Sequence, residues 1–83
     1  MIELKENNNG NFTGYSSQGT QLTIYQTKDE YGTPENQWRW LMSHKAAQWS
    51  SDDKFDTPQV ATADLTFFID DFYGKEVEME LVR

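Results

Sequence analysis

The stretch TPQVATADLTFFIDDFYG, residues 57–74, decides the fold because it contains both ends of a helix. Thr57 can cap the first turn, and Pro58 suits the first helical position, where its missing N–H costs no hydrogen bond. Gly74 is a good C-terminal stop because glycine readily adopts the left-handed conformation. The apolar residues between these ends recur with helical spacing and form one stripe: Ala61, Leu65, Phe68, Ile69 and Phe72. We therefore predict a helix of about four turns that buries Leu65, Phe68 and Phe72.

The segments on both sides of the helix have the alternating and β-branched pattern of strands. Strands are expected at residues 2–6, 11–17, 20–27, 38–43, 46–49 and 75–83. Gly14 is expected to mark a bulge, and Trp38 and Trp40 to face the core with Arg39 outside. Residues 28–37 are polar and contain Gly32 and Pro34, which predicts a long loop with Tyr31 in its middle. The 83 residues predict one α+β domain: an antiparallel sheet of about four to five strands, the helix on one face, and a final strand.

The last segment alternates strictly between apolar and acidic residues. Val77, Met79 and Leu81 share one face, and the other face carries Glu76, Glu78 and Glu80. In a strand these carboxylates would be about 6–7 Å apart, close to the spacing of phosphates along a nucleic-acid strand. The row fits either a nucleic-acid mimic or a solvated strand face, and the sequence does not choose between them.

The charge balance limits the class of partner. Fourteen acidic residues oppose seven basic ones, a net charge of −7. Such a surface repels phosphate backbones and anionic membranes, so we expect no direct nucleic-acid or membrane partner. It favours a protein partner with a basic surface, although acidity also serves solubility alone. The sequence has no apolar run of the length that a membrane helix needs, and its first residues do not resemble a signal peptide. We therefore expect a cytoplasmic location.

Residues for catalysis are few. The chain has one histidine, His44, and no cysteine. Ser43 is its neighbour, but adjacent strand residues point to opposite faces, and His44 is expected to be an exposed turn residue. The acidic segment near Asp52 lacks the central glycine and final glutamate of a calcium loop. We expect no enzyme, no metal site and no cofactor.

The strongest sign of function lies on the helix. Val60 and Phe67 project opposite the apolar stripe, with Asp64 and Asp71 on the same side. An exposed aromatic residue rimmed by charge is typical of a protein interface. A helix buried more broadly, or an isolated exposed Phe, would explain the pattern equally well. The candidate binding residues are Phe67, Asp64, Asp71, Glu76, Glu78, Glu80 and Tyr31.

The middle of the chain resembles the YegP-type family of small α+β domains. The likeness rests on Trp38-Arg39-Trp40, a short returning segment, a loop that ends at Phe55, and a helix. Residues 43–45 and 53–55 read Ser-His-Lys and Asp-Lys-Phe, where that family has an Asn-Gly turn and Glu-Gly-Tyr. The resemblance implies strands followed by a packing helix and transfers no catalytic residue.

Together these observations predict a non-enzymatic acidic protein-binding domain. In size and charge the chain also resembles small acidic virus-encoded inhibitors of host nucleic-acid-handling or defence proteins. The alternative is a small assembly subunit that forms a homo-oligomer through a sheet edge. The sequence leaves open whether the protein is a monomer or a homodimer.

Overall fold

The helix lies where its end signals place it. The structure is a computed structural model that describes residues 1–83, and in it α1 spans Pro58–Tyr73. The Thr57 hydroxyl accepts a hydrogen bond from the backbone N–H of Val60 at 3.1 Å. Gly74 adopts the left-handed conformation, with φ of 69°, and its N–H donates to the carbonyl of Asp70. The predicted cap, first-turn proline and C-terminal stop are all confirmed.

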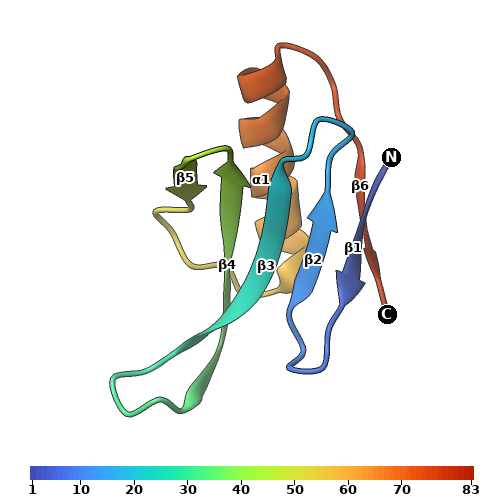
Figure 1. Cartoon of the computed structure of the whole chain (residues 1–83). Helices are drawn as coiled ribbons and strands as arrows, with labels where there is room; N and C mark the ends of the chain where they lie inside the picture. Colours follow the sequence, from blue (N-terminus) through green and yellow to red (C-terminus); the bar gives the residue numbers. More distant parts are fainter.

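The helix packs on one face of a six-stranded sheet (Figure 1). The strands are β1 (Ile2–Glu6), β2 (Phe12–Tyr15), β3 (Gln21–Lys28), β4 (Pro34–His44), β5 (Ala47–Ser50) and β6 (Met79–Val82). Their order across the sheet is β5-β4-β3-β2-β1-β6. The first five form an antiparallel meander, but β6 runs parallel to β1, with Ile2 opposite Met79.

The α+β class is thus confirmed, whereas the wholly antiparallel sheet of four to five strands is corrected to a mixed sheet of six. The reason is the path of α1, which carries the chain from the β5 edge across the sheet to the β1 edge (Figure 1). A crossover of that length lets the next strand pair in parallel, which a tight turn does not.

The core lies between α1 and the inner face of the sheet. The buried apolar residues are Ile2, Leu4, Phe12, Leu22, Ile24, Trp40, Met42, Ala61, Leu65 and Ile69. Leu65 is buried as predicted, but Phe68 is only half-buried and Phe72 is 38% exposed. Both rings pack on Trp49 of the edge strand β5, with centroids 6.3 Å and 5.2 Å away. Because β5 is the last strand on this side of the sheet, no further strand covers the rings beyond it.

Gly14 allows a close approach between strands. It pairs regularly with Leu22, so the predicted bulge is wrong. A Cβ at this position would lie 2.3 Å from the carbonyl oxygen of Glu3 on β1. The glycine is therefore required by the contact with β1 and not by a change of register.

Half of the predicted loop at residues 28–37 is strand. β3 continues to Lys28 and β4 begins at Pro34, which leaves residues 29–33 for the turn. The hairpin formed by residues 27–37, hereafter the β3–β4 arm, projects beyond the rest of the sheet (Figure 1). It has no apolar periodicity because it extends beyond the hydrophobic core, and its polar cross-strand bonds mark it as strand.

The last strand is shorter than predicted. Residues 75–78 are not strand, because they bring the chain from the end of α1 over to the sheet edge. Their path is held by two hydrogen bonds: Val77 N–H donates to the Asp70 carboxylate at 2.6 Å, and Ile2 N–H donates to the Glu78 carbonyl at 2.8 Å. None of the helical structure has the length and apolar composition that a bilayer crossing requires.

Candidate functional site

An open groove of about 860 Å³ runs beside the outward side of α1. One wall is the helix, and the other is the connection from β5 to α1. The lining residues are Trp40, Ser50, Ser51, Asp52, Asp53, Asp64, Phe67, Phe68, Asp70, Asp71, Gly74 and Lys75. The groove therefore gathers aromatic rings and carboxylates from segments that are distant in the sequence.

Phe67 is the most exposed aromatic residue of the groove. Its side chain is 78% exposed, and Val60, two turns earlier, is 50% exposed. Phe68, the next residue, turns inward, and its ring lies 4.9 Å from that of Trp40. The helical spacing predicted this division, since Phe67 lies opposite the buried Leu65 and Ile69.

Asp64 makes a structural contact that its position on the outward side of the helix does not predict. Its carboxylate accepts a hydrogen bond from the indole Nε1–H of Trp40 at 2.7 Å. Trp40 is only 3% exposed, so its N–H needs a partner within the protein. An inward-facing tryptophan on a strand is itself the signal that a nearby acceptor should be sought. The bond fixes one carboxylate at the floor of the groove.

Asp70 and Asp71 lie at the end of α1 where the helix dipole disfavours negative charge. Asp70 has a reason to be there, because its carboxylate binds the N–H of Val77 and shapes the connection to β6. Asp71 has no such bond and is exposed on the groove.

The groove is strongly acidic. Asp52 and Asp53 lie across from the helix carboxylates, and Lys75 is the one basic residue in the lining. In the sequence, the acidic segment near Asp52 and Asp53 only resembles an incomplete calcium loop. Its position opposite Asp64 and Asp71 follows from the fold alone. No cluster of three His, Cys, Asp or Glu side chains is arranged to hold a metal ion.

The other predicted binding residues lie elsewhere. Glu80 is on β6 in register with Glu3, whereas Glu76 and Glu78 precede the strand and line a second pocket beside Met1. The evenly spaced row of three glutamates is therefore not formed. Tyr31 lies at the tip of the β3–β4 arm and is 83% exposed. The structure brings together Phe67, Asp64 and Asp71 and separates the rest.

His44 is half-buried, so its prediction as an exposed turn residue is wrong. β4 extends to His44 on the same face as Met42, and the turn comes at Lys45, which has φ of 55°. The ring Nδ1 lies 2.8 Å from the Thr20 hydroxyl, which also contacts the hydroxyl of Tyr73. Thr20 is fully buried, and this network joins the end of α1 to the sheet.

Comparisons of the chain with family models, with curated proteins and with solved structures each find no match. The resemblance to the YegP-type family therefore stays a prediction, and a functional proposal rests on the geometry of the chain.

Proposed function

We propose that this chain is a non-enzymatic protein-binding domain and that the groove beside α1 is its contact surface. The observation that carries the proposal is the 78% exposure of Phe67 among the carboxylates of Asp64 and Asp71. A large apolar ring that adds little to the core of a small domain is better explained by a contact with another molecule.

The ring offers enough area to anchor a complex. A Phe side chain can bury on the order of 150–250 Å², most of which is still free at Phe67. At about 25 cal/mol per Å², covering the exposed 78% of the ring supplies roughly 3–5 kcal/mol before the costs of association. Val60, two turns away on the same side, extends the apolar strip. Such a pair fits the apolar centre of an interface with a charged rim.

The rim favours a basic partner. Asp52, Asp53, Asp64 and Asp71 all border the groove, in a chain with a net charge of −7. Exposed charges of one sign accelerate association with a surface of the opposite sign and discriminate against acidic proteins. In its specific form the proposal is an inhibitor of a nucleic-acid-handling or defence protein of a host cell, whose basic surface the groove would cover in the cytoplasm.

A second candidate function is assembly through a sheet edge. β5 forms one edge of the sheet and contains no charged residue, so its sequence AQWS lacks the usual protection against pairing with another strand. Sizing over a range of protein concentrations distinguishes the two candidates. A monomer at all concentrations favours the groove, and a dimer that is lost in Gln48→Pro favours the edge.

The groove is tested by capture from lysate with matched variants. Phe67→Ala and Asp71→Asn alter the groove, whereas Tyr15→Ala removes another exposed aromatic residue, 63% exposed, on a strand. Wild type and Tyr15→Ala should capture the same protein, Phe67→Ala should lose it, and Asp71→Asn should weaken capture most at low salt. If both groove variants are folded and capture as wild type does, the groove is not the interface.

A further inference from the structure

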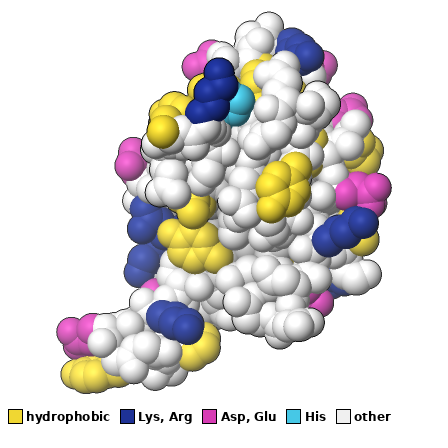
Figure 2. Space-filling view, viewed as in Figure 1, with side chains coloured by type: hydrophobic (Ala, Val, Ile, Leu, Met, Phe, Trp, Pro, Cys, Tyr) yellow, Lys and Arg dark blue, Asp and Glu magenta, His cyan; other side chains and the backbone are white.

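The β3–β4 arm extends beyond the part of the sheet in which β2 and β5 flank β3 and β4. β2 pairs with β3 only as far as Ile24, and β5 pairs with β4 only from Leu41 onward. Beyond these points no third strand pairs with β3 or β4. Other segments contact them there through the bridge between Trp38 and Phe55 and through single hydrogen bonds to Trp40 and Gln26. The space-filling view shows the arm standing away from the body, with hydrophobic atoms at its end (Figure 2).

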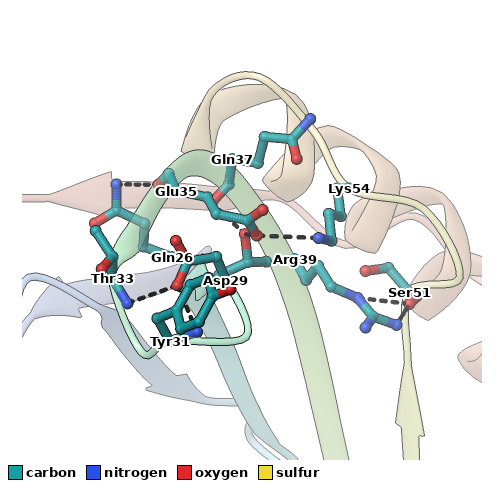
Figure 3. Close-up of polar contacts among 10 residues, drawn as sticks. Gln26, Asp29, Tyr31, Thr33, Glu35, Gln37, Arg39, Ser51 and Lys54 are labelled. Carbon is teal, nitrogen blue, oxygen red and sulfur yellow. Dashed lines mark hydrogen bonds and ion pairs between the residues drawn. The ribbon is translucent and has the colours of Figure 1, made fainter.

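The base of the arm is clamped by Glu35 (Figure 3). Its carboxylate accepts hydrogen bonds from the Thr27 hydroxyl at 2.7 Å and from the Lys54 ammonium at 3.0 Å. Its backbone carbonyl accepts a bond from the Gln26 side chain at 2.6 Å. Lys54 belongs to the connection between β5 and α1, so the clamp ties the arm to the body of the domain.

The tip is equally ordered. One carboxylate oxygen of Asp29 accepts the N–H groups of Tyr31 and Thr33, both at 2.9 Å. The turn closes through Gly32 N–H, which donates to the Asp29 carbonyl at 3.0 Å, and Gly32 has φ of 80°, which glycine adopts without strain. Tyr31 is held at the end of this turn and remains 83% exposed.

These bonds do not serve the core. An isolated two-stranded ribbon is marginally stable, and each ordered residue costs about 1–2 kcal/mol of backbone entropy. In the arm, these bonds hold the side chain of Tyr31, which is 83% exposed and lies outside the core. We propose that the β3–β4 arm is a preorganised insertion element, which places Tyr31 in a cleft of a folded partner protein. Tyrosine is enriched among the residues that dominate interfaces, and preorganisation lowers the cost of binding.

The arm also defines the chemistry of the cleft. A two-stranded ribbon with its side chains needs a slot about 10 Å wide. The ring requires apolar walls, and the phenol requires a hydrogen-bonding group at the floor. Asp29, Glu30 and Glu35 outnumber Lys28 on the arm, which argues against phosphate backbones and anionic membranes as occupants. The proposal does not depend on the groove beside α1, which other elements form.

Photo-crosslinking in the full chain tests the insertion. Benzoylphenylalanine is placed at Tyr31, at Phe67, or at Asn8 in the β1–β2 turn as a control, and each protein is irradiated in lysate from the native source. The expected result is a cross-link from position 31, absent from position 8, that maps to residues lining an apolar cleft of one protein. No cross-link at position 31 above the control, or one on a flat or acidic surface, overturns the insertion. A cross-link from position 67 alone overturns the insertion and leaves the groove proposal standing. A cross-link from position 31 alone supports the insertion and counts against the groove.

Affinity for the protein identified in this way gives the second measurement. Tyr31→Ala should weaken binding by about 30-fold or more, as for an interface hot spot. Asp29→Ala keeps the ring but removes two hydrogen bonds of the turn, and should weaken binding by about 3–10-fold through lost preorganisation. Unchanged affinity in Tyr31→Ala would refute the role of the arm even if a cross-link forms.

Discussion

The bond between Asp64 and Trp40 gives the sharpest test of how the groove is built. Asp64→Ala removes the acceptor of an indole N–H whose residue is only 3% exposed. A hydrogen bond to a charged group contributes about 1.5–3 kcal/mol, and a buried unpaired donor costs about as much. Because Asp64 itself is exposed, water can partly replace it, so we expect a loss of about 1–2 kcal/mol. Asp64→Asn keeps an oxygen at this place and should lose less than about 1 kcal/mol.

Urea unfolding followed by tryptophan fluorescence measures these losses. With a slope near 1 kcal/mol per M, expected for a small domain, Asp64→Ala should lower the midpoint by about 1–2 M. A double-mutant cycle with Trp40→Phe isolates the bond, because that change removes the N–H donor. In the Trp40→Phe background, Asp64→Ala should cost less than about 0.5 kcal/mol. An equal loss in both backgrounds would show that the bond contributes nothing to stability.

Three further predictions concern stability. Leu65→Ala should lower the free energy of unfolding by about 2–5 kcal/mol because Leu65 is fully buried. Phe68→Ala should lower it by less than the usual ~3–5 kcal/mol for Phe because its ring is half-buried. Denaturation curves in which Phe68→Ala is the more damaging change would contradict this packing. Gly14→Ala should destabilise the domain, since its Cβ would meet a backbone oxygen at 2.3 Å; an unchanged thermal midpoint would exclude that contact. The Thr27 hydroxyl, and then Lys54, lower the pKa of Glu35 below 4.5, so its contribution is present above that value and is lost as the pH falls through the lower folded-state pKa. Glu35→Gln should reduce the acid sensitivity of the unfolding midpoint below pH 4.5, and an unaltered pH profile would count against the clamp.

Local patterns predicted the helix correctly because its determinants are local. The cap at Thr57 and the stop at Gly74 act through bonds that span a few residues of chain. The helical period of the apolar residues distinguished the outward Phe67 from the buried Leu65. One part of the candidate site could therefore be predicted from the sequence.

The remaining parts of the candidate site depend on tertiary contacts. Asp64 meets the indole of Trp40, 24 positions away, and Asp52 and Asp53 border the groove only because the chain returns from β5 before it enters α1. A pattern within one segment does not predict a contact between distant segments, because the packing of the whole fold decides which partner satisfies a buried polar group.

Amino-acid sequence by itself determined which segments could be helix or strand, through capping, period and turn residues. The tertiary structure decided how those segments pair and what they cover. β6 lies parallel to β1 because α1 crosses the whole sheet. Phe72 stays partly exposed because it packs on the edge strand β5, beyond which no strand follows. The β3–β4 arm is strand despite its polar sequence, since the bonds of Glu35 and Asp29 supply the order that burial supplies elsewhere. Burial and cross-strand bonding are properties of the whole fold, and for that reason they could not be read from any one stretch of the chain.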